Sequence, residues 1–294
     1  MNLESLDRRW VFLGVAVLTF GGLLLPFRLP QVPGETSISY YNALQNLPPG
    51  SLVMISADYS PSTRPELEPM HRLTIYHALK NGHRVINIAL WDVGVNQTAL
   101  AMGWALAQLA SEGVHPRKDV DYLNLGFKAG GEVVMSQMGS SIPTTFRKDQ
   151  EGRYIWENAE IPVVAGLHDM KDVDLLVTIS AGSPGINQWL AQVQKRYNVA
   201  TVAGVTAVMA PELYTFYHSR QLLGFLGGLV GAADYEKLLG MTERGDAVGL
   251  SILVPDFANR AMVAQSLIHY ALVLVIIIVN VDFILRRRAR GGRS

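Results

Sequence analysis

The 294-residue sequence contains no cysteine, which excludes disulfides, cysteine-ligated zinc, iron–sulfur clusters and thiol nucleophiles. It is also poor in charge: Asp, Glu, Lys and Arg make up 17% of the chain, against roughly 25% in an average soluble domain. The 25 basic and 25 acidic side chains balance, so the chain lacks the positive excess that favours nucleic acid as a partner. The small charged fraction and the positive mean hydropathy favour contact with a lipid bilayer.

Two apolar segments lie near the ends of the chain. Residues 10–27, WVFLGVAVLTFGGLLLPF, contain no charged side chain, and residues 262–285 are purely apolar from Ala271 to Val279. Each is long enough to cross the hydrocarbon core of a membrane as a helix. Arginines flank both segments on their outer sides: Arg8, Arg9, Arg286, Arg287, Arg288, Arg290 and Arg293. Short arginine-rich flanks stay in the cytoplasm. We therefore expect a two-pass protein of the cell membrane, with both termini in the cytoplasm and the main domain outside it.

Two features of these segments have alternative interpretations. The first segment is either an uncleaved anchor or a signal peptide. The sequence LLLPFRLP at its end offers no small-x-small cleavage site, which favours the anchor. Asp282 lies four residues before Arg286, one helical turn away, which favours an interfacial ion pair over a proton-relay carboxylate.

Between the two segments, short apolar runs alternate with stretches of helical periodicity. The predicted strands are 51–58, 84–92, 120–126, 173–180 and 199–205, and the predicted helices are 65–82, 96–113, 130–139 and 186–198. Apolar strands that alternate with helices are typical of a parallel sheet covered on both faces. The sequence therefore predicts an α/β fold: a Rossmann-like three-layer domain with a mostly parallel sheet, flanked by N- and C-terminal transmembrane helices. Residues 140–172 are too long for a simple connection, and we interpret them as a hairpin or flap, or as an ordinary surface excursion.

These assignments divide the chain into six parts. They are an N-terminal transmembrane anchor (1–28), a linker (29–50), the extracytoplasmic α/β domain (51–240), a connector (241–261), the C-terminal transmembrane helix (262–285) and a basic cytoplasmic tail (286–294).

Polar and small residues follow four of the predicted strands. The candidate ligand-binding residues are Asp58, Ser60, Asp92, Asn96, Lys128, Gly130, Gly131, Ser180 and Ser183. The carboxyl ends of parallel strands meet at one edge of a sheet, where helix N-termini offer free N–H groups. The set is suited to a small polar or anionic ligand. The same residue types also cap helices and form turns in any fold of this class.

Motifs for particular chemistry are missing. GFKAGG (126–131) is neither the dinucleotide fingerprint nor a phosphate loop, and SAGSPG (180–185) is not a nucleophile elbow. The seven histidines have no metal-ligand spacing, so we predict no metal site and no cofactor. Whether the protein is an enzyme stays open.

Residues 172–205, DVDLLVTISAGSPGINQWLAQVQKRYNVATVAGV, place an apolar strand, a turn of small residues, a helix and a second apolar strand in succession. In this order the segment resembles part of the periplasmic substrate-binding domains that have parallel Rossmann-like lobes. The resemblance implies the same kind of fold and an exported location. Those proteins have two lobes, whereas this chain has room for one full lobe and a fraction.

Residues 221–240, QLLGFLGGLVGAADYEKLLG, are apolar all round if they form one helix, and such a helix must be buried. Small residues would form rows along it: Gly224, Gly227, Gly228, Gly231 and Ala232. Rows of this kind permit close backbone contact between helices. The sequence therefore suggests either an interface between copies of the chain at these residues or a helix buried within its own domain.

Taken together, these features favour a membrane-anchored extracytoplasmic α/β scaffold or binding subunit of a homo-oligomeric or larger membrane complex. The expected partners are the lipid bilayer and other copies or subunits, with no nucleic acid. The alternative is a membrane-tethered hydrolase or transferase that acts at the carboxyl ends of the strands through Asp58, Asp92, Lys128 and Ser183.

Overall fold

The computed structural model describes residues 8–24, 32–156, 161–241 and 257–291. The chain divides into two units. One unit comprises residues 1–30 and 259–294, and the other comprises residues 31–258.

The larger unit is an α/β domain. Its strands are β1 (Leu52–Asp58), β2 (Arg84–Ala89), β3 (Tyr122–Phe127), β4 (Leu175–Ser180), β5 (Thr201–Val205) and β6 (Gly224–Gly227). Its longer helices are α2 (Glu35–Gln45), α3 (Arg64–Lys80), α4 (Gly94–Ser111), α5 (Glu132–Ser140), α9 (Ala210–His218) and α10 (Gly228–Leu238). Its short helical segments are α6 (Ile142–Thr145), η2 (Pro162–Val164), η3 (Met170–Asp172), α7 (Ile186–Trp189), η4 (Leu190–Gln194) and α8 (Lys195–Tyr197).

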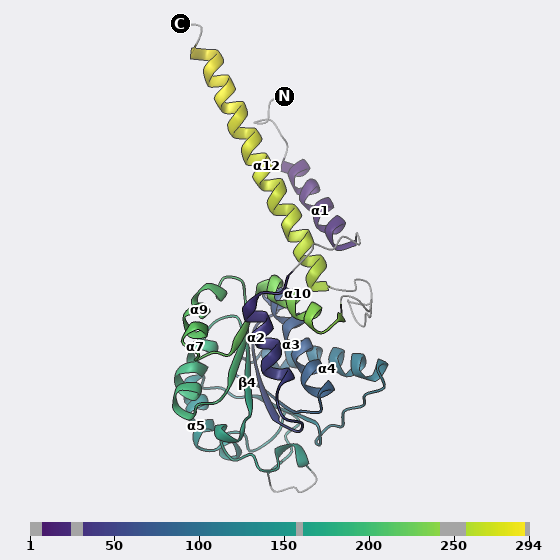
Figure 1. Cartoon of the computed structure of the whole chain (residues 1–294), viewed down its shortest axis with the longest axis vertical. Coiled ribbons are helices and arrows are strands. Elements are labelled where there is room, and N and C mark those ends of the chain that lie inside the picture. Colours follow the sequence, from purple (N-terminus) through teal and green to yellow (C-terminus); the bar gives the residue numbers. More distant parts are fainter. Residues whose placement is uncertain (1–7, 25–31, 157–160, 242–256, 292–294) are drawn as a thin grey trace. The chain divides into compact units, whose positions relative to one another are not determined.

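The six strands form one sheet in the order β3-β2-β1-β4-β5-β6, and every neighbouring pair is parallel. Strands β1, β4 and β5 are buried along their whole length, as expected for a parallel sheet with covered faces. Figure 1 shows α3 and α4 on one side of the sheet and α5 and α7 on the other. The predicted Rossmann-like α/β fold is confirmed, because this order is that of the doubly wound dinucleotide-binding folds.

The five strands predicted from apolar runs are all present, but the prediction of a single helix over residues 221–240 is wrong. Gly224–Gly227 form the edge strand β6, and Gly228, whose φ is +58°, begins α10. A four-residue strand with glycine at both ends has too few side chains to show a period of two.

The small residues of this region make contacts inside the domain. A Cβ atom on Gly224 would lie 2.3 Å from the backbone nitrogen of Tyr40 on α2, and one on Gly231 would lie 2.8 Å from the carbonyl carbon of Leu226. Ala232 is fully buried. The corrected set, Gly224, Gly227, Gly228, Gly231 and Ala232, therefore does not line one helix face. Its contacts support the interpretation of this region as part of the domain core. The predicted interface between copies was based on a row of small residues along one helix, and that row is not present.

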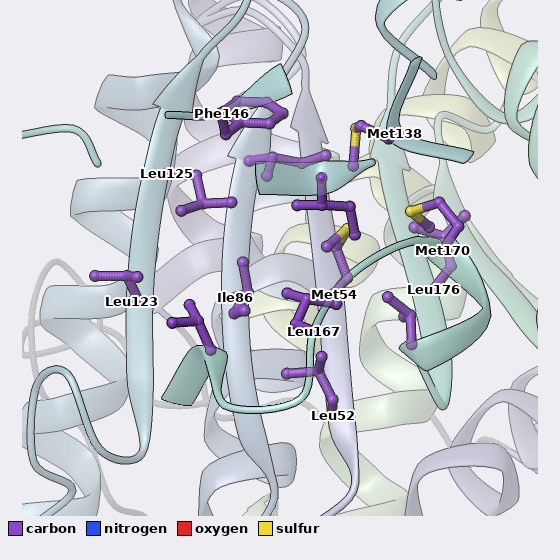
Figure 2. Close-up of a cluster of buried hydrophobic side chains, with 14 of the residues drawn as sticks. Leu52, Met54, Ile86, Leu123, Leu125, Met138, Phe146, Leu167, Met170 and Leu176 are labelled. Atoms are coloured by element: carbon purple, nitrogen blue, oxygen red, sulfur yellow. The ribbon is translucent and has the colours of Figure 1, made fainter. Parts of the chain in front are cut away.

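Residues 140–172, which the sequence leaves as a hairpin, flap or surface excursion, largely cover one face of the sheet. Phe146, Leu167 and Met170 are buried in the same apolar cluster as strand residues such as Leu52 and Met54. Figure 2 shows these side chains lying against the strands. Most of the segment is thus a layer of the core. A short hairpin with an antiparallel bridge between residues 148 and 154 extends from it.

The smaller unit contains α1 (Arg8–Leu24) and most of α12 (Phe257–Gly291). In the described part of the chain one helix is long and apolar enough to cross a membrane, and this is Arg260–Val281, with 22 residues and a mean hydropathy of 2.4. Helix α1 is also apolar but has 17 residues, or about 26 Å at 1.5 Å per residue. Residues 25–27 of the first predicted span lie outside the described residues, as do the side chains of the predicted Asp282–Arg286 ion pair.

The two helices of the smaller unit contact each other closely. A Cβ atom on Gly22 would lie 2.5 Å from the Cα atom of Ala264. The Arg260 guanidinium donates a hydrogen bond of 3.3 Å to the carbonyl oxygen of Leu23. Glycine at position 22 therefore allows the end of α1 to pack directly on the backbone of α12.

Candidate functional site

Strands β1 and β4 are neighbours in the sheet although β2 and β3 separate them along the chain, so the strand order reverses between them. Asp58 ends β1 and is the register partner of Ser180, which ends β4. Ligands of doubly wound folds bind in the crevice at this point. Both residues were candidates from the sequence, and the structure places them side by side at this point.

Asp58 is nevertheless fully buried, and both of its carboxylate oxygens accept hydrogen bonds. Its Oδ1 accepts the backbone N–H groups of Leu90, at 2.6 Å, and Trp91, at 3.2 Å. Its Oδ2 accepts the hydroxyl of Ser56 at 2.5 Å. Burial raises the pKa of Asp58 to about 6, and these hydrogen bonds oppose the rise. The carboxyl group thus ties the end of β1 to the turn between β2 and α4.

The loops after β2, β3 and β4 cover this end of the sheet. The indole N–H of Trp91 donates to the carbonyl oxygen of Pro184 at 3.1 Å. A Cβ atom on Gly182 would lie 3.4 Å from the Trp91 ring, and one on Gly131 would lie 3.5 Å from the Pro184 ring. Ser180 is buried below these loops and accepts the N–H of Ile186 at 3.3 Å. The loops therefore pack on one another over the place where a ligand was expected.

The remaining candidates from the sequence have mostly local partners. The hydroxyl of Ser60 bonds to that of Ser62 at 2.7 Å, and the carboxylate of Asp92 accepts the N–H of Val93 at 2.8 Å. Asn96 and Ser183 are exposed. Gly130 and Gly131, with φ of +130° and +50°, form the turn that leads into α5. Lys128 lines an open pocket.

A pocket of about 790 Å³ lies beside the end of β3. Three cationic side chains line it, Lys128 from the loop after β3 and Arg147 and Lys148 from the segment after α6. The aromatic rings of Phe127 and Tyr154 also line it. We call it the cationic pocket, defined by Lys128, Arg147 and Lys148.

A close contact between backbones fixes the two sides of the cationic pocket. Gly126, in β3, has φ of +82°, and a Cβ atom there would lie 3.3 Å from the Cα atom of Gln150. The N–H of Gln150 donates to the carbonyl oxygen of Asn124 at 3.0 Å. Glycine at 126 therefore lets Gln150 lie directly against the end of β3, where Lys128 begins the next loop.

The hairpin from Lys148 to Tyr154 is braced from within. The N–H of Asp149 donates to the carbonyl oxygen of Arg153 at 3.0 Å, and the Asp149 carboxylate accepts the N–H of Glu151. The Asp149 carboxylate also accepts the N–H and the guanidinium of Arg153, at 2.9 and 2.7 Å. Asp149 is thus the acidic residue that lines the pocket, and its carboxylate is paired with the guanidinium of Arg153.

None of the three cationic side chains of the pocket is paired with an acidic residue within the described part of the chain. Lys128 and Arg147 are exposed, and within the described ranges neither side chain has a hydrogen bond or an ion pair. The Lys148 ammonium lies 4.5 Å from the centre of the Tyr154 ring, a cation–π contact that leaves its charge in place. The lining therefore carries three cations and one acid that is paired with Arg153, and this excess of positive charge favours an anion.

Sequence reasoning missed Arg147 and Lys148. Both lie in the segment 140–172, which has no periodic pattern, and a tertiary contact with β3 brings them to Lys128. Their positive charges, adjacent in a stretch otherwise assigned to the surface, were the signal available. Among the described residues, no three His, Asp or Glu side chains gather in a way that could hold a metal ion.

Comparisons with known proteins add little. No family model matches the chain, and no curated protein matches it. One solved structure, a crystal structure analysis of the glycotransferase of kitacinnamycin, aligns with 14% identity and a TM-score of 0.23 over 70% of this chain. The chain spans 44% of the length of that protein. A TM-score of this size establishes no relationship between the two proteins.

Proposed function

We propose that this chain is a membrane-anchored binding protein whose α/β domain takes an anionic ligand in the cationic pocket. The sequence suggested either a scaffold or a binding subunit, and this proposal takes the second of these. The observation that supports it is the convergence of Lys128, Arg147 and Lys148 on one open pocket without an unpaired acid in its lining. An anion placed among them would replace mutual repulsion by attraction.

The construction of the pocket supports binding rather than chance clustering. The contact of Gly126 with Gln150 and the ion pair between Arg153 and Asp149 hold the hairpin 148–154 against the sheet. A pocket that is already formed loses less conformational entropy when the ligand binds. Its volume of about 790 Å³ lies within the usual range for small-molecule sites.

The membrane part of the proposal rests on α12 and α1. Side chains of α12 such as Val273, Ile276 and Phe283 are more than half exposed, as they would be in contact with lipid acyl chains. The arginine-rich flanks favour cytoplasmic termini and an extracytoplasmic domain. Assembly with other copies or subunits stays a prediction of the sequence.

The alternative, a hydrolase or transferase at the carboxyl ends of the strands, has less support. Asp58 is buried beneath loops and bonded by three donors, so it is not placed to act on a substrate. Asp92 bonds to the N–H of the next residue at the start of α4.

Calorimetric titration of the full chain in mild detergent with inorganic phosphate tests the proposal. We expect binding that weakens as ionic strength rises. Arg147→Ala and Lys128→Ala should each lower the affinity by about tenfold. Lys195→Ala, which removes an exposed lysine that lines neither pocket, is the matched control and should bind as the parent does. Equal losses in control and pocket variants, or no binding of phosphate, sulfate or citrate, would reject the proposed function.

A further inference from the structure

A second pocket adjoins the cationic pocket. It has a volume of about 570 Å³ and is lined by Ser136, Gln137 and Ser140 of α5, together with Val133 of the same helix. Thr144 and Thr145 of α6 line both pockets. The two pockets therefore share two lining residues. We call the second one the hydroxyl pocket, defined by Ser136, Gln137, Ser140, Thr144 and Thr145.

The hydroxyl pocket differs from its neighbour in chemistry. No charged residue lines it, and five of its six lining residues carry a hydroxyl or an amide. The hydroxyls of Thr144 and Thr145 donate to the carbonyl oxygen of Ser141, at 3.2 and 2.7 Å, which leaves their oxygen lone pairs free to accept. Gln137 and Ser140 are exposed and offer both donors and acceptors. Such a lining matches a ligand that is rich in hydroxyl groups and uncharged in this part.

The cationic pocket adds two flat apolar surfaces. Phe127 is 41% exposed and Tyr154 is 65% exposed, and both line the pocket. The Lys148 ammonium lies over the Tyr154 ring. Exposed aromatic rings beside polar groups suit a ligand with an apolar face and a polar edge.

We propose that the two pockets form one groove for a polyol phosphate, with the phosphate among Lys128, Arg147 and Lys148. The hydroxyl-bearing part then extends past Thr144 toward Gln137 and Ser140. This inference rests on the proposed function and specifies its ligand class. A free sugar phosphate and the head group of a phosphorylated inositol lipid share this chemistry.

The first experiment separates the two halves of the groove by titrating the full chain in mild detergent. We expect glucose 6-phosphate to bind about tenfold more tightly than inorganic phosphate, and glucose alone to bind much more weakly than either. Gln137→Ala and Ser140→Ala should lower the affinity for glucose 6-phosphate about three- to tenfold and leave that for phosphate unchanged. Arg147→Ala should weaken both.

A matched control guards against general damage. Ser111→Ala removes a hydroxyl from α4 that bonds to the carbonyl oxygen of Gln108 and lines neither pocket, so it should bind like the parent. A thermal melt of each variant confirms that it is folded at the temperature of the titration.

The outcomes distinguish this inference from the proposed function. If phosphate binds and depends on Arg147, but glucose 6-phosphate binds no more tightly, the polyol half is rejected and the anion site remains. If adenosine monophosphate binds more tightly than glucose 6-phosphate, the ligand class is wrong. If no anion binds, both ideas fail.

A second arm identifies the source of the ligand. The full chain is placed in phosphatidylcholine nanodiscs with and without phosphatidylinositol 4-phosphate. Protection of Arg147 and Lys148 from chemical modification only in the discs with the phosphoinositide would support a lipid head group. Protection by soluble glucose 6-phosphate in plain discs would support a free ligand. Absence of protection in both overturns the inference.

Discussion

The guanidinium of Arg153 donates two hydrogen bonds to the carboxylate of Asp119, at 2.9 and 2.8 Å. The same guanidinium donates to Asp149 at 2.7 Å, so one side chain joins the hairpin 148–154 to the segment before β3. The pair holds the pKa of the Asp119 carboxyl below its usual range, chiefly through the hydrogen bonds from Arg153. A residue outside the cationic pocket thus braces the hairpin that carries Lys148.

Replacing Arg153 should therefore weaken ligand binding although it does not line the pocket. Arg153→Ala leaves Asp149 largely buried without its cation, and we expect a loss of stability of about 1–2 kcal/mol and a severalfold loss of phosphate affinity. Arg117→Ala, which breaks an exposed pair with Asp121, is the control and should change neither quantity measurably. Chemical unfolding measures the stability of each variant, and titration of the same samples measures its affinity for phosphate. An unchanged affinity would show that the hairpin 148–154 keeps its position without Arg153.

The approach of Gln150 to Gly126 can be tested with two glycines of the same conformation. Gly126 and Gly152 both have φ of +82°, but a Cβ atom on Gly126 would meet Gln150 at 3.3 Å, whereas one on Gly152 would meet no atom within 4 Å. Alanine at either position has the backbone cost of positive φ, about 1 kcal/mol. Gly126→Ala should lose more stability than Gly152→Ala and, unlike it, should also lower phosphate affinity. Equal effects on both measurements would mean that the close approach does not shape the pocket.

Asp58 should give the protein an unusual dependence of stability on pH. Its pKa is about 6 in the folded chain, raised by burial from a usual value of 3.8. The folded state therefore binds the proton more tightly than the unfolded state between these values. The stability that protonation provides is complete below about pH 4 and is lost as pH rises through about 6.

Asp58→Asn removes this dependence while an amide oxygen can still accept the N–H groups of Leu90 and Trp91. Relative to the parent, the variant should gain up to about 3 kcal/mol between pH 4 and pH 7. The comparison with the parent is needed because burial lowers the pKa of His71 and of His77 to about 3, which makes acid destabilising for both proteins. Urea unfolding at several pH values measures the difference, and parallel curves would show that Asp58 is ionised throughout.

The sequence predicted the central strands because burial on both faces leaves uninterrupted apolar runs, such as Leu52–Asp58 with its buried polar end. It also predicted that Asp58 and Ser180 would meet at one edge of the sheet, which follows from parallel strands alone. It could not predict that Trp91 and Pro184 close over them, because that depends on side-chain packing between loops. Arg147 and Lys148 reach Lys128 through contacts between segments far apart in the chain, which have no local pattern.

Strand β6 was not predicted for the same reason, because the contact that requires glycine at position 224 comes from a distant segment, α2. Glycines spaced four apart fit a helix interface, and the sequence contains no sign that the backbone of α2 occupies the space beside Gly224. A Cβ atom on Gly224 would lie 2.3 Å from the Tyr40 nitrogen and 2.7 Å from the Ser39 carbonyl carbon, and backbone atoms cannot move aside without displacing the helix.

Gly224→Ala should therefore destabilise the α/β domain, by about 2–4 kcal/mol as an overpacked core, without changing the mass of the particle in mild detergent. Gly103→Ala on α4 is the matched control, because a Cβ atom there meets no atom within 4 Å and alanine favours a helix by up to about 1 kcal/mol. Thermal unfolding and light scattering should be measured on the same samples. A smaller particle with unchanged unfolding temperature for Gly224→Ala would restore the interface between copies that the sequence suggested. A lower unfolding temperature at constant mass would show that these glycines serve the packing of one chain.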